Sequence, residues 1–451
     1  MQITVVGLGY VGLVTAACLA RLGQQVRGYD SDAAKVSALG DGRAPFYEPG
    51  LQGALTERAT ALRFTTDAGE AFTDADAILI CVGTPSLPSG EADLGAVMAV
   101  ADTISASIDR PTVVALRSTV PVGTTERVEA RLNAALAARG WSEPVPVLAN
   151  PEFLRTGRAL DDFLRPARVV LGRTAMATDA HVDVLANLYR PLEAPIFILD
   201  ARSAELVKNA ANTYLATRVS FVNELAALCD ATGASVSAVI DGIAADPRIG
   251  GDYLRPGLGY GGSCLPKDVR SIIAQGSEHG EMMPLARAVD EVNERQADRV
   301  ADRLQDAVGM RLDGARIALF GLAFKPDTDD TRDSPALTLA RTLRARGATV
   351  VACDPQATDR VARDEPWIEL ARSPEEAARG ADAVVLATEW PAYVTADLEP
   401  IAAAMRGHVL YDGRNVLDRS RVEAAGLVHV AIGGGDGAPA ASMDVLRSGR
   451  D

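Results

Sequence analysis

Short apolar runs rich in β-branched residues alternate with longer Ala-, Leu- and Arg-rich segments over the first 200 residues. An apolar run of this length, bounded by turn signals, is typical of a strand buried on both faces of a parallel sheet. Such strands are expected at residues 3–6, 77–82, 112–116, 145–148, 169–171 and 196–199. The pattern therefore predicts an α/β domain in this part of the chain.

The strand pattern stops after Asp200, and an uninterrupted helical pattern continues to Gly233. A helix of this length usually bridges domains or packs against a partner subunit. Strand and helix patterns alternate again from about residue 316, which predicts a second, smaller α/β domain. The predicted divisions are residues 1–200, 201–310 and 311–433, followed by a disordered tail at 434–451 that is rich in Gly, Ala and Ser. The fold class expected is α/β, with two doubly wound domains joined by a long central helix.

Composition restricts the partners and the compartment. A net charge of −15 argues against non-specific binding to nucleic acid or to anionic membranes, so neither partner is expected. The cysteine number is odd, and Cys18, Cys81 and Cys353 lie in apolar runs where they are expected to pack rather than react. This usage, together with an N-terminus that leads straight into a strand, predicts a cytoplasmic protein. No metal site is expected.

A glycine fingerprint follows the first predicted strand. Gly7, Gly9 and Gly12 stand between that strand and an apolar helix pattern, where glycines permit a tight turn and close approach of a pyrophosphate. Asp30 ends the run "QQVRGYD", a further strand predicted after that helix, at the position where a carboxylate holds ribose hydroxyls. The alternative is a glycine-rich turn without a ligand. The context favours a Rossmann domain that binds NAD, and Asp30 favours NAD over NADP although Lys35 is nearby.

One cysteine stands in a different setting, the stretch "YGGSCLPKD". Gly261 and Gly262 allow close approach of a ligand, and Pro266 suits the first turn of a helix. Cys264 would then precede a helix N-terminus, where the dipole and Lys267 favour a nucleophilic thiolate. The alternative is a small buried cysteine that only packs.

Three further polar residues are candidates for the same chemistry. Lys208 and Asn212 lie four apart and so share one helix face. They would offer an ammonium and an amide to an oxyanion, or else form an exposed polar stripe. Glu152 follows a predicted strand, where open α/β sheets place their ligands, although such a residue is often only a surface carboxylate.

A series of motifs carries a family resemblance. They are "GLGYVG", "EPGL", "VGTP", "STVPVGTT", "NPEFLRTGRALDDFLRP", "AELVKNAANTYLATRVSFVNE", "DPRIG", "GYGGSCLPKD", "GLAFKPDTDDTRDSP" and "DGRN". In this order and spacing the chain resembles the nucleotide-sugar 6-dehydrogenases up to about Asp418. The resemblance implies an NAD-binding Rossmann domain, a central helix that builds a homodimer, and a Rossmann-like C-terminal domain that holds the nucleotide diphosphate.

The family's reaction oxidises a sugar C6 alcohol to a carboxylate through two hydride transfers to two NAD+. The resemblance implies that Cys264 adds to the aldehyde as a thiohemiacetal, which is then oxidised to a thioester. It implies that Lys208 and Asn212 stabilise the oxyanions. Asp268 would act with Lys208 and a water in proton transfer, and Glu152 and Thr119 would position the hydrolytic water.

The resemblance also implies two binding sets. The cofactor residues are Gly7, Gly9, Tyr10, Val11, Gly12, Asp30, Lys35, Thr84, Thr119, Glu152 and Arg332. The substrate residues are Glu152, Lys208, Asn212, Arg248, Tyr253, Gly261, Lys325 and Arg414, with Arg248 reaching across the dimer.

UDP-glucose is the substrate that the resemblance favours. Ser263 and Lys267 argue against the N-acetylhexosamine enzymes, which typically carry histidine before the cysteine. Ala167 in place of an aspartate and Tyr260 in place of a phenylalanine loosen the assignment, so GDP-mannose or another UDP-hexose stays an alternative.

Two other kinds of protein compete with this interpretation. A two-electron hydroxyacid dehydrogenase shares the Rossmann domain and a Lys/Asn helix pair, but needs neither the thiolate nor a second Rossmann-like domain. An inactive NAD-binding scaffold would have no reason to keep Cys264, Lys208, Asn212, Asp268 and Glu152 together.

Overall fold

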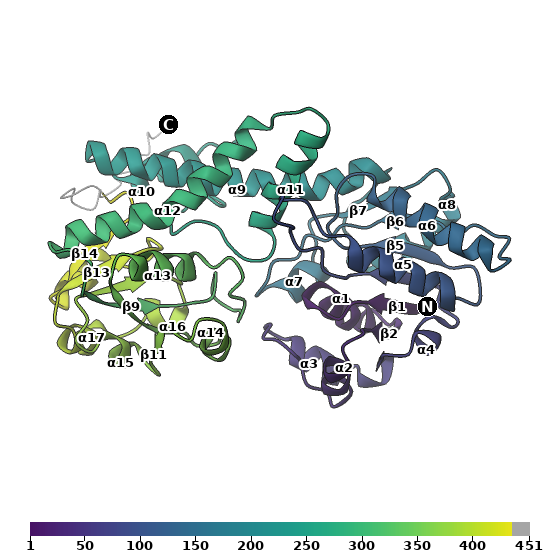
Figure 1. Ribbon diagram of the computed structural model, residues 1–451, viewed down its shortest axis with the longest axis horizontal. Helices are drawn as coiled ribbons and strands as arrows, with labels where there is room; N and C mark the ends of the chain where they lie inside the picture. The colour runs from purple at the N-terminus through teal and green to yellow at the C-terminus, as the bar shows by residue number, and fades with distance from the viewer. Residues whose placement is uncertain (435–451) are drawn as a thin grey trace, which may run out of the picture. The chain divides into compact units, whose positions relative to one another are not determined.

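The computed structural model describes residues 1–434 and contains two compact units (Figure 1). The first comprises residues 1–212 and 267–283, and the second comprises 213–266 and the chain from 284 onward. Helix α9 (Ala201–Thr232) joins the two parallel-sheet units, which confirms the predicted fold class. The three predicted boundaries between these segments stay predictions, and the tail expected at 434–451 lies from residue 435 onward outside the described residues.

The first unit is built on an eight-stranded sheet of described residues in the order β3-β2-β1-β4-β5-β6-β7-β8. Its strands are β1 (Gln2–Val6), β2 (Gln25–Tyr29), β3 (Leu62–Thr65), β4 (Ala77–Ile80), β5 (Val113–Leu116), β6 (Val147–Ala149), β7 (Val169–Arg173) and β8 (Ile196–Asp200). The order of the first six strands is that of a Rossmann domain, which places nucleotides beyond the carboxyl ends of the central strands.

Helices cover both faces of this sheet because successive residues of a buried strand point to opposite sides. On β4, Ala77 and Leu79 pack into one core and Ile78 and Ile80 into the other. The first core is shared by helices α1 (Tyr10–Arg21), α2 (Ala33–Gly40), α3 (Leu51–Glu57), α7 (Ala159–Leu164) and α8 (Asp179–Tyr189). The second is shared by α4 (Ala68–Phe72), α5 (Gly95–Ser107) and α6 (Thr124–Ala138).

Two strand expectations were wrong in detail. The run at 169–171 was expected in a parallel strand; β7 pairs parallel with β8, but it pairs antiparallel with β6 through Ala149 and Gly172. The run at 196–199 was expected to be buried, but β8 is an edge strand on which Phe197 and Ile198 are about half exposed. An apolar run does not encode the direction of its partner strand, nor does it tell whether another molecule covers it.

The second unit repeats the same strand order in a six-stranded, all-parallel sheet within the described residues, β11-β10-β9-β12-β13-β14. Its strands are β9 (Arg316–Phe320), β10 (Thr349–Cys353), β11 (Glu369–Leu370), β12 (Ala383–Leu386), β13 (Val409–Asp412) and β14 (Val428–Ala431). Its helices are α10 (Val236–Ala244), α12 (Pro284–Val308), α13 (Pro335–Ala345), α14 (Thr358–Asp364), α15 (Pro374–Ala378), α16 (Pro391–Val394), α17 (Leu398–Ala404) and α18 (Arg419–Ala424).

The repetition extends to the turn after the first strand of each sheet. In the first unit Asp30 accepts a hydrogen bond from the Leu8 amide at 2.7 Å. In the second unit Asp354 accepts one from the Leu322 amide, also at 2.7 Å. Both turns begin with a left-handed glycine, Gly7 at φ 87° and Gly321 at φ 98°. The two units are therefore two copies of one Rossmann-type architecture.

Two other features are absent from residues 1–434. No helix there has the length and apolar character that a bilayer crossing requires. The same residues contain no cluster of three or more His, Cys, Asp or Glu side chains that could hold a metal ion.

Candidate active site

The dinucleotide loop has the geometry that close approach of a phosphate requires. Gly7 adopts φ 87°, and a Cβ on Gly12 would lie 1.8 Å from the Gly7 carbonyl oxygen, so both positions need glycine. No described atom lies within 4 Å of a Cβ built on Gly9. Gly9 is also the N-cap of α1 and offers no side-chain cap, which leaves the first amides of the helix to an anion.

Asp30 lies directly after β2, as predicted, and its carboxylate is fixed in place. It accepts hydrogen bonds from the Leu8 amide at 2.7 Å and the Asp32 amide at 3.0 Å, and it pairs with Lys35 Nζ at 2.8 Å. Burial alone would raise the pKa of Asp30, but these hydrogen bonds and the Lys35 charge together lower it. Asp30 is therefore ionised at neutral pH, the state that accepts from ribose hydroxyls and repels a 2′-phosphate. The loop and this carboxylate fit NAD.

Other predicted cofactor residues follow the neighbouring strands. Thr84 comes shortly after β4, and its Oγ1 donates to the Thr119 carbonyl at 2.6 Å, which links it to the loop after β5. Val11 is half-buried in the first turn of α1. These residues belong to the carboxyl ends of β1, β4 and β5, the edge at which Rossmann sheets bind ligands.

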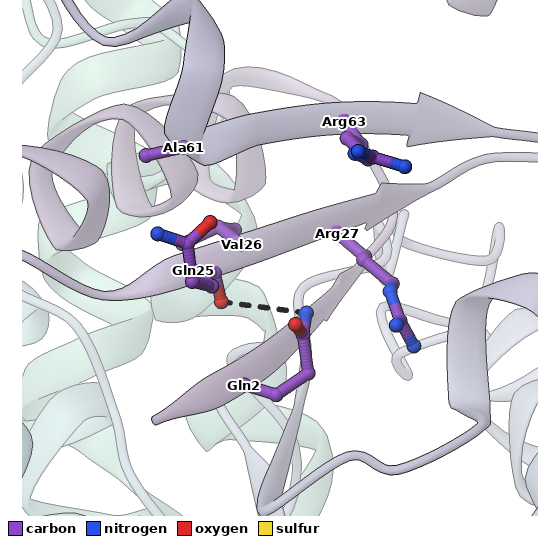
Figure 2. Close-up of a pocket in the computed structure, with 6 residues that line it drawn as sticks. All are labelled: Gln2, Gln25, Val26, Arg27, Ala61 and Arg63. Atoms are coloured by element: carbon purple, nitrogen blue, oxygen red, sulfur yellow. Dashed lines mark hydrogen bonds between the residues drawn. The ribbon is translucent and has the colours of Figure 1, made fainter.

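A hollow of about 260 Å³ lies elsewhere on the first unit (Figure 2). Its lining residues are Gln2, Gln25, Val26, Arg27, Ala61 and Arg63. They belong to β1, β2 and β3 or precede them, whereas the predicted site residues follow the strands. This hollow is not part of the candidate site.

Helix α9 brings Lys208 and Asn212 to the site on one face. The Lys208 ammonium lies 3.3 Å from Glu152, which follows β6, and the two side chains are only 4% and 5% exposed. One turn further, Asn212 Nδ2 donates to Asp268 at 2.6 Å. The alternatives of an exposed polar stripe and a surface carboxylate are therefore wrong. A buried ammonium, an amide and two carboxylates stand along this helix, as stabilisation of an oxyanion and proton transfer require.

Three members of this group, Glu152, Lys208 and Asp268, are each held by a further contact. Glu152 accepts from the Leu154 amide at 2.5 Å, and Lys208 lies over the Phe153 ring at 5.5 Å. Lys267 Nζ pairs with Asp268 at 2.5 Å, and Asp268 is fully buried in the first turn of α11 (Leu265–Glu278). Fixed charges of this kind cost little reorganisation when a substrate charge develops.

Glu205 is a supporting residue that the sequence did not reveal. It is 3% exposed, and it accepts from the Gly123 amide, the Thr125 amide and Thr125 Oγ1, each at 2.6 Å. It thereby caps α6 and ties the "STVPVGTT" loop to the turn of α9 that precedes Lys208. Burial raises the pKa of Glu205, although these hydrogen bonds oppose the shift. The only sequence signal is a Glu in an otherwise apolar turn of the helix.

In the second unit, the glycine-rich loop packs closely against the 324–335 segment. A Cβ on Gly261 would lie 2.2 Å from the Asp333 carbonyl oxygen. Gly262 has φ 82° and donates to the Arg332 carbonyl at 3.0 Å. Cys264 comes directly before the first residue of α11, as predicted, and is half-buried.

The other cysteines differ from Cys264. Cys18, Cys81 and Cys353 are buried, and burial raises the pKa of each thiol to about 12. At neutral pH they are neutral thiols that pack, as predicted, and Cys229 is buried as well.

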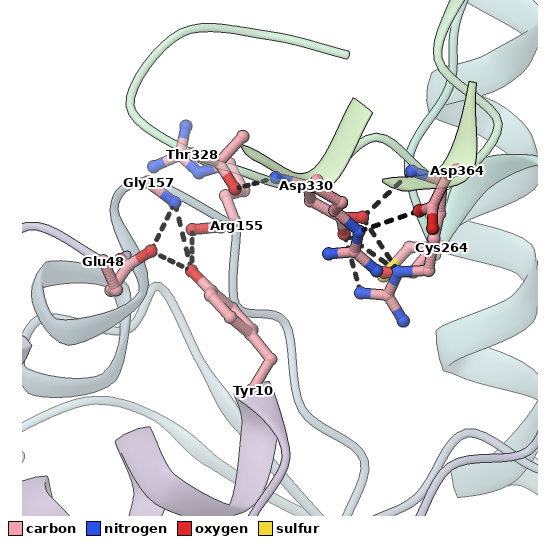
Figure 3. Close-up of polar contacts among 11 residues, drawn as sticks. Tyr10, Glu48, Arg155, Gly157, Cys264, Thr328, Asp330 and Asp364 are labelled. Atoms are coloured by element: carbon pink, nitrogen blue, oxygen red, sulfur yellow. Dashed lines mark hydrogen bonds and ion pairs between the residues drawn. The ribbon is translucent and has the colours of Figure 1, made fainter. Parts of the chain in front are cut away.

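Two predicted substrate cations of the second unit, Lys325 and Arg414, contact Phe324. Lys325 Nζ lies 5.4 Å from the Phe324 ring, and Arg414 Nη2 donates to the Phe324 carbonyl at 3.1 Å. The Phe324 ring also limits the space beside Gly262. Arg332 forms a two-pronged contact with Asp330, which raises the pKa of Arg332 despite burial, and Figure 3 shows Asp330 and Cys264.

Two predicted substrate residues have a different setting. Tyr253 is half-buried in a left-handed conformation at φ 60°. Arg248 is exposed and forms its contacts with its neighbour Asp246. The structure does not bring Arg248 to the group around Phe324.

The predicted residues thus divide between the units. The first contains Gly7, Gly9, Tyr10, Val11, Gly12, Asp30, Lys35, Thr84, Thr119, Glu152, Lys208, Asn212 and Asp268. The second contains Arg248, Tyr253, Gly261, Cys264, Lys325, Arg332 and Arg414.

The glycine-rich loop, the ionised Asp30 carboxylate and a second Rossmann-type unit are the features expected of an NAD-dependent dehydrogenase. Comparison with known proteins agrees. The chain belongs to the UDP-glucose/GDP-mannose dehydrogenase family, whose NAD binding domain matches residues 1–193, central domain 202–295 and UDP binding domain 318–419. It is therefore an NAD-dependent nucleotide-sugar dehydrogenase.

Three relatives illustrate the similarity. The chain is 42% identical over 444 residues to the UDP-glucose 6-dehydrogenase of Pseudomonas aeruginosa, covering 96% of this chain and 97% of that one. A UDP-glucose dehydrogenase structure from Pyrobaculum islandicum has a TM-score of 0.87 at 37% identity, covering 96% and 97% of the two chains. A UDP-D-ManNAc dehydrogenase structure from Pyrococcus horikoshii has a TM-score of 0.85 at 30% identity, covering 97% and 100%.

Proposed function

We propose that the protein oxidises the C6 hydroxyl of UDP-glucose to the carboxylate of UDP-glucuronate and reduces two NAD+. The observation that carries this proposal is the buried pair of Lys208 and Glu152 beside the Asn212–Asp268 hydrogen bond. These groups can accept the proton that the hydroxyl loses, and they can stabilise the negative charge that develops on its oxygen.

The first oxidation converts the alcohol to an aldehyde. The C6 hydride leaves for the cofactor, and the hydroxyl proton passes to the network of Asp268, Lys208 and a water. Lys208 and Asn212 stabilise the oxygen as its charge grows. NAD supplies the hydride acceptor, held by the glycine loop and Asp30.

The second oxidation passes through Cys264. Its thiolate adds to the aldehyde carbon to give a thiohemiacetal, which loses a second hydride to become a thioester. The position before the α11 N-terminus supports a thiolate, because the free amides and dipole of a helix start favour negative charge.

Water then cleaves the thioester, with Glu152 and Thr119 positioning the water, and releases the carboxylate and the Cys264 thiol. Overall, one alcohol, two NAD+ and one water give one carboxylate, two NADH and three protons. A two-electron dehydrogenase would need neither this cysteine nor the UDP binding domain that matches residues 318–419.

UDP-glucose is favoured among nucleotide sugars by Ser263 before the cysteine and by the identity to the Pseudomonas enzyme. The similarity to the Pyrococcus structure keeps a UDP-N-acetylhexosamine as the second candidate. Lys325 and Arg414 are proposed to bind the substrate, with Tyr253 and Gly261 beside them. Arg332 is proposed to act at the cofactor.

A homodimer is part of the proposal. Tyr214, Phe221 and Leu228 are 61%, 50% and 59% exposed on α9, and they lie seven residues apart. Apolar side chains at this spacing line one side of a helix, as in a helix-to-helix interface. Arg248 would then reach the substrate of the partner subunit. The cytoplasmic location stays a prediction.

The proposal is tested by Cys264→Ser, with Cys353→Ser as the matched control because Cys353 is buried in the second unit. We expect Cys264→Ser to form no UDP-glucuronate, by chromatography of the products, while NAD binding stays within about twofold of the unaltered protein, since cysteine and serine differ little in size. The control should form product normally. Full production of the acid by Cys264→Ser would refute the covalent route.

A further inference from the structure

Glu48 is a buried carboxylate that the reaction described above does not use. It is 5% exposed and stands in the "EPGL" loop just before α3. A carboxylate so far from water needs partners that satisfy its charge. Its partners come from two segments far away in the sequence, as Figure 3 shows.

Each of these partners donates to Glu48. The Gly157 amide donates to Oε2 at 2.7 Å, and the Ala159 amide donates to Oε1 at 2.7 Å. The Tyr10 hydroxyl also donates to Oε2. Hydrogen bonds to a charged acceptor are stronger than those between neutral groups, so this contact holds both segments firmly.

Tyr10 completes a closed arrangement. Its hydroxyl donates to Glu48 and accepts from the Gly157 amide at 3.0 Å. Burial, together with the charge and hydrogen bond of Glu48, raises the pKa of Tyr10, so the phenol remains a donor at any physiological pH. Gly157 has φ 81°, a conformation that a glycine adopts at little cost.

Both segments belong to the candidate site. Tyr10 stands inside the glycine fingerprint, between Gly9 and Gly12. Gly157 lies five residues after Glu152 in the same segment. The Glu152 carboxylate accepts a hydrogen bond from the Leu154 amide at 2.5 Å and pairs with Lys208. The contacts of Glu48, the short run of chain from Gly157 back to Glu152, and the Glu152–Lys208 pair therefore connect the cofactor loop to the ammonium on α9.

We propose that Glu48 is a positioning residue that keeps the dinucleotide loop and the segment carrying Glu152 in one fixed arrangement. Loss of this carboxylate would disturb cofactor binding through Tyr10 and turnover through Glu152. The proposal rests on the proposed function for its second effect. The first effect concerns NAD alone and can be measured without any sugar.

The test compares Glu48→Gln with Tyr10→Phe, their double variant, and Glu129→Gln as the matched control. Glu129 is also a buried carboxylate of the first unit, which accepts from the Val147 amide at 3.0 Å and from Thr174 Oγ1 at 2.6 Å. Calorimetry gives the NAD dissociation constant, and steady-state kinetics with UDP-glucose give kcat and KM. Thermal unfolding of each variant separates loss of stability from loss of function.

We expect Glu48→Gln to weaken NAD binding by about tenfold or more and to lower kcat as well, because small displacements of positioned groups are costly. Tyr10→Phe should weaken NAD binding similarly, and the double variant should lose little more, since both changes remove one linkage. Glu129→Gln should lower the melting temperature but change the dissociation constant and kcat by less than about twofold.

Two results would overturn the proposal. One is Glu48→Gln behaving as Glu129→Gln does, with only the melting temperature lowered. The other is that the fold-losses of NAD affinity in Glu48→Gln and in Tyr10→Phe multiply in the double variant. If Glu48→Gln does not fold, normal NAD binding by Tyr10→Phe also refutes the linkage. If the unaltered protein oxidises no nucleotide sugar, the proposed function fails while the NAD measurements still decide this inference.

Discussion

Two alanine substitutions in the glycine fingerprint should separate cofactor recognition from folding. Gly9→Ala places a Cβ in a position from which no described atom lies within 4 Å. Gly12→Ala places a Cβ 1.8 Å from the Gly7 carbonyl oxygen and 3.1 Å from Cys81 Cβ. The same chemical change therefore meets empty space at one position and backbone at the other.

The magnitudes follow from these distances. Gly9 has φ −75° and ψ −164°, which alanine adopts, so Gly9→Ala should cost no more than about 1 kcal/mol of unfolding free energy through the weaker N-cap. In Gly12→Ala the new Cβ would lie much closer to the Gly7 carbonyl oxygen than an ordinary contact of about 3.5 Å. The substitution should cost about 3 kcal/mol or more of unfolding free energy, because the backbone must move.

Both Gly9→Ala and Gly12→Ala should weaken NAD binding. A Cβ on Gly9 blocks the approach of the diphosphate and should remove one amide-to-phosphate hydrogen bond worth about 1.5–3 kcal/mol, or about 10- to 150-fold in affinity. The assay is calorimetric titration with NAD beside urea unfolding of each variant. Normal NAD affinity in Gly9→Ala, or equal destabilisation by Gly9→Ala and Gly12→Ala, would refute the assignment of the loop.

Three other outcomes are expected. Burial alone would raise the pKa of the fully buried Asp412, but His429, whose Nε2 lies 3.7 Å from the carboxylate, and hydrogen bonds from the Arg414, Val416 and Leu417 amides lower it. The stabilisation from this carboxylate is complete above the unfolded pKa of about 3.9 and is lost as pH falls through the folded pKa. Asp412→Asn should therefore cost about 2 kcal/mol in urea unfolding at pH 7 and progressively less as the pH falls below about 3.9, and a loss that does not change with pH would contradict this. Phe221→Arg should halve the mass by light scattering, while an unchanged mass would exclude the α9 stripe as the interface. NADP+ should be at least about 100-fold poorer than NAD+ in kcat/KM because ionised Asp30 repels the 2′-phosphate, and comparable values would contradict that role.

Much of the fold and several site positions could be predicted because local pattern determines them. Apolar runs marked the buried strands, and the four-residue spacing of Lys208 and Asn212 put them on one face of α9. The sequence left open whether that face was exposed. Burial of Lys208 against Glu152 depends on a strand that ends far away in the chain, and spacing carries no such information.

Other features depended on tertiary contacts that no local pattern records. Strand β3 was missed because "LRFT" mixes polar and apolar residues at the sheet edge. The antiparallel pairing of β7 and the exposure of β8 depend on which neighbour each run meets. Glu48 and Glu205 accept mainly from backbone amides of distant loops, and amides look alike in every sequence.

The most direct test of the central claim is the amount of NADH formed per UDP-glucose consumed, followed at 340 nm with UDP-glucose limiting. The account predicts two NADH per UDP-glucose, because the aldehyde stays in the site and is oxidised again through Cys264. One NADH per UDP-glucose, with free aldehyde in solution, would contradict it.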